Sequence, residues 1–105
     1  MIKILLACGT GASSGFVAQS MRKAAKAKGI EVSIKATSDT EIQEYASDID
    51  VLLIGPHLKH RFVEIQESVK QFPVKAMLIN AEHYAILNGE AVLEEVLKEV
   101  LKEVQ

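Results

Sequence analysis

The chain has 105 residues, with 12 Lys and Arg against 14 Asp and Glu, a formal net charge of -2 and one cysteine. This length predicts a single domain spanning residues 1–105, and the slightly acidic balance argues against a nucleic-acid partner, which needs a broad basic face. One cysteine excludes a disulfide framework and a four-cysteine zinc site. The first apolar run is too short for a signal core or a membrane span, so we expect a cytoplasmic protein without direct membrane insertion.

The first third of the chain reads as strand, helix, strand. Residues 2–7 are an aliphatic run that predicts a strand ending at a glycine turn. Ser13 or Ser14 is expected to cap the following helix, which places Phe16 and its apolar neighbours on the inner face and ends at Gly29. Residues 30–35 then alternate between apolar and polar side chains, which is typical of a strand near the edge of a sheet.

The rest of the chain repeats this alternation. An uninterrupted apolar run predicts a strand covered on both faces at residues 51–54. The remaining expected elements are a short helix at 41–47, a helix at 60–72, a strand at 74–79 and a last helix opened by Asn88-Gly89.

Strands that alternate with helices indicate an α/β fold. Parallel strands need crossover connections, so we expect a four-stranded parallel open sheet in the order 2-1-3-4 with helices on both faces. Ligands of such sheets bind at the carboxyl ends of the strands, where the strand order reverses. This order places the loops after Cys8 and Gly55 beside each other.

The stretch that begins at Cys8 is the candidate site. Its glycines leave the backbone free to turn N–H groups into a concave nest, and the helix that follows adds its positive end, so the loop suits a bound dianion. The same donors stabilise a thiolate at Cys8, which then serves as the nucleophile that accepts a phosphoryl group; the alternative is a buried structural cysteine before a tight turn. The expected phosphate-binding loop comprises Gly9, Thr10, Gly11, Ala12, Ser13, Ser14 and Gly15.

Three other phosphate chemistries fit the sequence less well. The glycines form GxGxxxG rather than the dinucleotide pattern GxGxxG, and no lysine between Lys3 and Lys23 can complete a Walker A motif. No acidic residue precedes Glu31, so the first strand lacks the carboxylates of a phosphoaspartate receiver domain.

Along most of its length the chain resembles the IIB subunits of the lactose/cellobiose (diacetylchitobiose) family of the bacterial phosphotransferase system. The family loop reads C-x-x-G-x-S-S/T-S, and only Gly15 departs from it, in place of the last serine. Residues 53–56 followed by 64–66 are similar to the family's LxGPQ and EIQ segments, with His57 in place of glutamine. Tyr84 and the Asn88-Gly89 turn also fall at matching places.

This resemblance implies a phosphocarrier. A phosphohistidine on a IIA partner would pass its phosphoryl group to Cys8, and the phosphocysteine would pass it to a cellobiose-, chitobiose- or lactose-class sugar bound by the membrane IIC permease. The family implies a monomer with no cofactor.

The resemblance also implies the fold that low-molecular-weight tyrosine phosphatases share. These enzymes carry an arginine six residues after the cysteine, where this chain has Ser14, and neither proline of the chain follows an aspartate, so the D-P general acid is missing. A small cysteine phosphatase and a non-catalytic anion-binding regulatory module remain the alternative functions.

Two residues outside the loop are candidates for the rim of the site. His57 follows Gly55-Pro56 at the expected active edge, where it either contacts phosphate or faces solvent. Tyr84 is either a core ring or part of a docking rim. The histidines and Cys8 match no zinc-binding spacing, so we expect no metal site.

Overall fold

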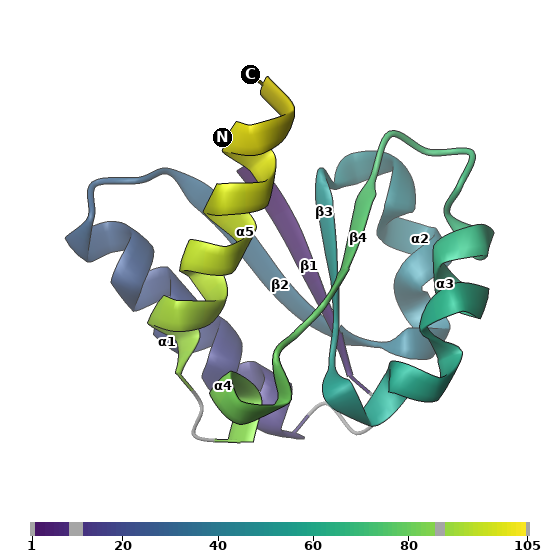
Figure 1. Cartoon of the computed structure of the whole chain (residues 1–105), viewed down its shortest axis with the longest axis horizontal. Helices are drawn as coiled ribbons and strands as arrows, with labels where there is room; N and C mark the ends of the chain where they lie inside the picture. Colours follow the sequence, from purple (N-terminus) through teal and green to yellow (C-terminus); the bar gives the residue numbers. More distant parts are fainter. Residues whose placement is uncertain (1, 9–11, 86–87, 105) are drawn as a thin grey trace.

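A computed structural model describes residues 2–8, 12–85 and 88–104 of the chain. Its centre is a four-stranded parallel sheet in the order β2-β1-β3-β4 (Figure 1). The fold class and the strand order expected from the sequence are therefore confirmed. The strands are β1 (Ile2–Cys8), β2 (Val32–Ser38), β3 (Val51–Ile54) and β4 (Lys75–Leu78).

Helices cover both faces of this sheet. In Figure 1, α1 and α5 lie on one side of the strands, and α2 and α3 lie on the other. The α-helices are α1 (Ala12–Ala27), α2 (Ile42–Tyr45), α3 (Phe62–Ser68), α4 (Ala81–Ala85) and α5 (Gly89–Val104). In the described part of the chain, three 3₁₀ segments accompany them, η1 (Asp39–Glu41), η2 (Ala46–Asp48) and η3 (Pro56–Arg61).

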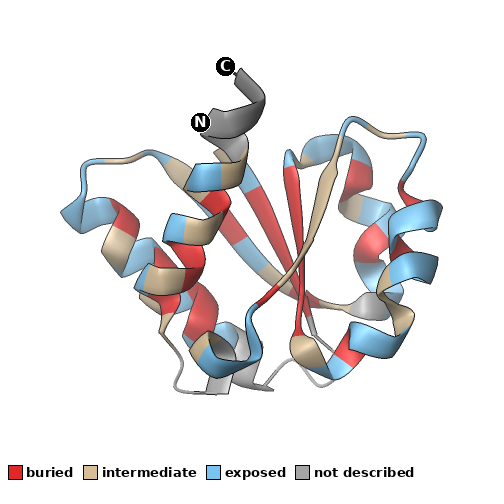
Figure 2. Ribbon diagram, viewed as in Figure 1, coloured by how far each residue is buried: buried red, intermediate tan, exposed pale blue. Residues whose placement is uncertain are grey.

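The core is divided by the sheet into two apolar clusters. Successive side chains of a strand point to opposite faces, so Ile4 and Leu6 of β1 pack with α1 and α5 while Leu5 packs with α2 and α3. All four residues of β3 are buried, as its uninterrupted apolar run predicts, and the buried residues line the inner faces of the layers (Figure 2). Each aliphatic side chain buried in this way stabilises the fold by about 1.5–3 kcal/mol.

The second strand begins later than expected. Gly29, with a φ of 69°, ends α1 in the left-handed conformation, and the Ile30 N–H donates to the Ala25 carbonyl over 2.9 Å. Ile30 therefore belongs to the helix end, and pairing with β1 runs from Ile2 opposite Val32.

Two expected helices are shorter than the sequence pattern suggests. Residues 41–47 are divided among η1, α2 and η2, and residues 60–72 form only the end of η3 and α3. Helix α3 ends because the Ser68 hydroxyl donates to the Ile65 carbonyl over 2.7 Å and Val69 leaves helical geometry.

Helix α4 was not expected from the sequence. The Asn80 side-chain oxygen accepts the N–H groups of Glu82 and His83 at 2.8 and 3.3 Å, so Asn80 acts as its cap. The asparagine directly after a strand was the signal that could have revealed this helix.

Candidate functional site

Cys8 is the last residue of the central strand β1. It pairs with Ser38 of β2 on one side, and the Gly55 N–H donates to the Ala7 carbonyl over 2.9 Å on the other. The chain turns to opposite sides of β1 in its first two crossovers, so Cys8 lies where the strand order reverses. This is the position at which open α/β sheets bind ligands.

The positive end of α1 lies at the same edge. The helix begins at Ala12, four residues after Cys8, and its first turn holds no acidic residue. Helix α1 has 16 residues, so its macrodipole and unpaired N–H groups favour an anion near its start. The strand end and the helix start are thus the two described ends of the expected phosphate-binding loop.

The loop itself is only partly described. Gly9, Thr10 and Gly11 lie outside the described residues, as do the side chains of Cys8, Ala12, Ser13 and Ser14. Because the helix begins at Ala12, the expectation that Ser13 or Ser14 is its N-cap is wrong, and both lie within its first turn.

Gly15 is exposed in α1. A Cβ atom built on Gly15 would meet no heavy atom within 4 Å. Close packing therefore does not require a glycine at this position.

His57 lies at the Cys8 edge, as expected. It is exposed in η3, two residues after Gly55, and the Leu58 N–H donates to the Gly55 carbonyl over 2.9 Å to close the turn. Its neighbours Lys59 and His60 are exposed as well. The segment from 55 to 61 carries cations and histidines but no acidic residue.

Tyr84 is held on α4, which follows β4 at the carboxyl edge of the sheet (Figure 1). Its side chain lies outside the described part of the structure. The neighbouring His83 is turned toward α5, because its Nδ1 lies 3.2 Å from the Glu95 carboxylate.

A small polar cluster occupies the β2 side of the edge. Thr37 is buried opposite Ala7, and its hydroxyl donates to the Glu41 carboxylate; the hydroxyls of Ser38 and Thr40 lie 2.9 Å apart. The Glu41 carboxylate is thus engaged within the protein.

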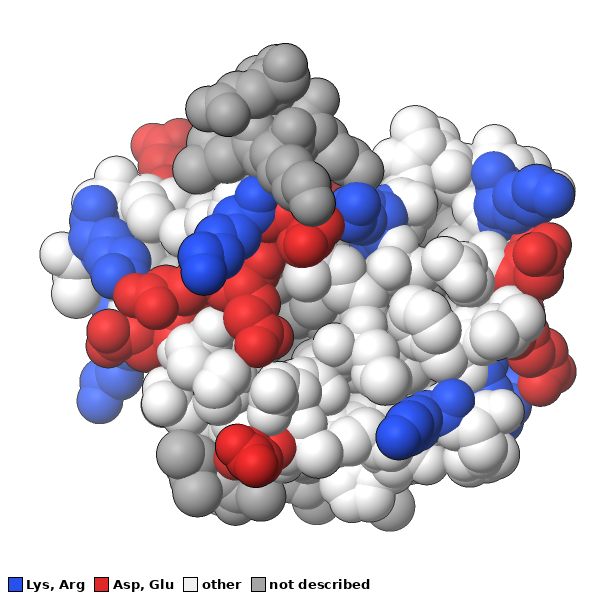
Figure 3. All heavy atoms as spheres, viewed as in Figure 1, with Lys and Arg blue, Asp and Glu red and all other residues white. Residues whose placement is uncertain are grey.

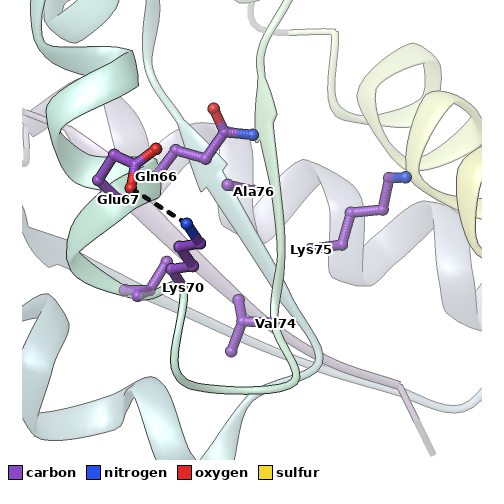
Figure 4. A pocket seen from close by; sticks show the side chains of 7 residues that line it. Gln66, Glu67, Lys70, Val74, Lys75 and Ala76 are labelled. Carbon is purple, nitrogen blue, oxygen red and sulfur yellow. Dashed lines mark ion pairs between the residues drawn. The ribbon is translucent and has the colours of Figure 1, made fainter.

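A hollow of about 540 Å³ lies away from this edge, between α3 and the beginning of β4 (Figure 4). Gln66, Val74 and Ala76 line it, together with Glu67 and Lys70, whose charged atoms are 3.9 Å apart. None of its lining residues is a cysteine, serine or histidine.

Among the described residues, no group of three or more His, Cys, Asp or Glu side chains could hold a metal ion. Within the same residues, no helix is both long and apolar enough to cross a membrane.

Two solved structures are similar to this chain. A lactose-specific IIB component domain from Streptococcus pneumoniae superposes with a TM-score of 0.83 over 92% of this chain and 95% of that chain; at 15% identity it establishes the shared fold alone. The solution structure of a cellobiose-specific phosphotransferase IIB component from Borrelia burgdorferi is 34% identical, with a TM-score of 0.70 over 89% of this chain and 85% of that chain. This is the fold that low-molecular-weight tyrosine phosphatases also adopt.

Sequence comparison gives the same result. The oligo-beta-mannoside-specific EIIB component of Bacillus subtilis (strain 168) is 30% identical over 95 residues, which cover 90% of this chain and 92% of that protein. The family model "PTS system, Lactose/Cellobiose specific IIB subunit" matches residues 3–95. The chain therefore belongs to the lactose/cellobiose-specific IIB subunits of the phosphotransferase system.

Proposed function

We propose that this protein is a phosphocarrier in which Cys8 accepts a phosphoryl group from a phosphohistidine of a IIA protein. Cys8 then passes the group to a sugar of the cellobiose, chitobiose or lactose class that is held by a membrane IIC permease. The observation that carries the proposal is the position of Cys8 at the end of the central strand, four residues before the positive end of α1. The protein acts in the cytoplasm as a monomer and needs no cofactor.

The first step is an in-line displacement at phosphorus. The Cys8 thiolate attacks, a sulfur–phosphorus bond forms, and the phosphorus–nitrogen bond to the imidazole of the donor breaks. Backbone N–H groups of Gly9 to Gly15 and the start of α1 stabilise the charge on the phosphoryl oxygens. The donor imidazole takes up a proton that balances the one Cys8 lost on becoming a thiolate, and it leaves as a neutral group.

In the second step a sugar hydroxyl attacks the same phosphorus atom. The sulfur–phosphorus bond breaks, Cys8 leaves as a thiolate, and the proton of the hydroxyl passes to a base. Hydrolysis of the phosphocysteine by water would release inorganic phosphate before the group reached the sugar. Ser14 occupies the position at which a phosphatase carries arginine, so the loop lacks the guanidinium that stabilises the transition state of hydrolysis.

The acceptor is tested by replacing Cys8. The protein is incubated with phosphoenolpyruvate, the general phosphotransferase components and a IIA protein of the lactose/cellobiose family. We expect one phosphoryl adduct by intact mass, with the phosphorus NMR signal of a phosphocysteine, and complete loss of the adduct in Cys8→Ser. His57→Gln is the matched control. It removes an exposed imidazole at the edge that carries Cys8 and leaves Cys8 in place, so the adduct should persist.

The outcomes separate the candidate functions. An adduct that survives Cys8→Ser but is lost in His57→Gln would move the acceptor to the histidine and contradict the proposal. Turnover of a chromogenic phosphate ester by the wild-type protein would indicate a phosphatase. No adduct from an active donor would indicate an anion-binding module.

A further inference from the structure

Two large apolar side chains are strongly exposed among the described residues. Phe16 of α1 is 63% exposed and Val63 of α3 is 69% exposed. The helical spacing of the sequence predicts Phe16 in the core, and this prediction is wrong. Val17 and Met21 fill the inner face of α1, while Phe16 borders a surface hollow of about 270 Å³ with Gln19 and Lys23.

Both side chains lie at the edge of the sheet that carries Cys8. Phe16 is in the second turn of α1, which begins four residues after Cys8, and Val63 is in the first turn of α3, directly after η3. Helices α1 and α3 cover opposite faces of the sheet (Figure 1), and Phe16 and Val63 lie near the N-terminal ends of these two helices.

The segments next to Cys8 carry fewer acidic side chains than the β4 side of the same edge, where Glu82 of α4 and Glu90 of α5 are exposed. Residues 12–21 of α1 carry no charged side chain, and η3 contributes the exposed Lys59 and no acidic residue. Glu64 of α3 is paired with Arg61, whose Nε lies 3.5 Å from its carboxylate. On the face shown in Figure 3, most acidic side chains gather on the side of α5, where Glu94 and Glu99 belong.

We infer that Phe16 and Val63 are the apolar anchors of the surface that receives the phosphoryl donor protein, and that Lys59 attracts the negative charge of that protein. This inference rests on the proposed function. Exposed aromatic residues are enriched in protein interfaces. A single apolar residue on a surface needs no partner. Two such residues, one on each of the helices that cover the two faces of the sheet beside the reaction centre, are typical of a docking surface.

Charge complementarity selects the donor among the candidate occupants. A phosphorylated donor presents a dianion to Cys8, and the exposed Lys59 and the positive end of α1 complement it. A second copy of this chain presents no phosphoryl dianion to the positive end of α1. The sugar that receives the group from Cys8 is neutral and gains nothing from Lys59.

The test measures transfer from a phosphorylated IIA protein to Cys8 by rapid quenching and intact mass. Phe16→Ser should raise KM about tenfold, Val63→Ser should raise it a few-fold, and kcat should change little in either variant. Lys59→Glu should raise KM most at low salt, because screening weakens the repulsion that it introduces. Lys70→Glu is the matched control, since Lys70 is an exposed lysine beyond the other end of α3, and its KM should stay unchanged.

Two further measurements distinguish a defect in docking from a defect in folding or in the reactivity of Cys8. The thermal midpoint should match the wild type in all four variants, and the rate of alkylation of Cys8 by iodoacetamide should match it in Phe16→Ser, Val63→Ser and Lys70→Glu. Unchanged KM in Phe16→Ser and Val63→Ser would overturn the inference and leave the proposed function standing. A fall in kcat alone would also overturn it, as would a wild-type dimer in light scattering that is lost in Phe16→Ser. Failure of the wild-type protein to take up phosphoryl groups would remove the proposed function and the inference together.

Discussion

At the scale of single residues, the contact between Ser20 and Gly89 holds α1 against α5. The Gly89 N–H donates to the Ser20 hydroxyl over 3.1 Å. A Cβ atom on Gly89 would lie 2.5 Å from the Met21 backbone nitrogen and 2.6 Å from the Ser20 Cβ. The absence of a side chain therefore lets the start of α5 approach the middle of α1, the helix whose N-terminus faces the site.

Gly89→Ala should lower the free energy of unfolding by about 1–3 kcal/mol, because backbone atoms of α1 must move to admit the methyl group. Gly15→Ala is the control. Its Cβ has open space, and alanine favours the helix, so we expect a gain of up to about 1 kcal/mol. Urea denaturation of both variants measures the difference, and an equal effect of the two substitutions would contradict the close-contact argument.

At the scale of elements, a side chain of α1 covers part of the edge strand β2. An edge strand exposes N–H and C=O groups that can pair with another chain. On β2, the Arg22 guanidinium of α1 donates to the Ile34 carbonyl through both Nε, at 3.1 Å, and Nη2. Arg22 thus occupies a backbone acceptor of that edge, and it serves the fold rather than the phosphate site.

Arg22→Met should lower the free energy of unfolding by about 1–2 kcal/mol, since it removes a charge-assisted hydrogen bond and leaves the Ile34 carbonyl to water. The variant should also aggregate faster near its thermal midpoint because the β2 edge becomes accessible. Lys26→Met is the control, with the same change in charge at the last turn of the same helix. Light scattering during heating compares the two, and equal aggregation would show that Arg22 does not protect the edge.

At the scale of the whole molecule, one sheet joins two apolar clusters. Leu93 of α5 is fully buried in the cluster on one face, and Ile65 of α3 is buried in the cluster on the other. Strands β1 and β3 contribute side chains to both clusters. Loss of either helix layer would therefore expose the same central strands.

This sharing predicts a single cooperative unfolding transition, which would test the expectation of one domain over residues 1–105. Leu93→Ala and Ile65→Ala should each lower the free energy of unfolding by about 2–5 kcal/mol and move the whole transition. Far-UV circular dichroism and tyrosine fluorescence should report the same midpoint in each variant. A second transition in either variant would mean that the two layers unfold separately.

Much of the fold was predictable from local sequence patterns. The unbroken apolar run at 51–54 indicated a strand covered on both faces, and the alternation after Gly29 indicated an edge strand; both are confirmed. The position of Cys8 at the carboxyl end of β1 and of His57 at the same edge also followed from the order of the elements. Contacts of the loop residues with phosphate stay a prediction.

The sequence by itself determined the order of the strands and of the helices that connect them, apart from α4, because the period of the apolar residues records which faces are buried. It also determined the candidate chemistry, because a cysteine before a glycine-rich turn is a local feature of the chain. Only the tertiary structure decided that Phe16 faces outward, that Gly89 meets α1 and that Arg22 covers the edge of β2. These three features depend on contacts between residues that are distant in sequence. The packing of α1 against its neighbours sets those contacts, and no periodic pattern along the chain records them.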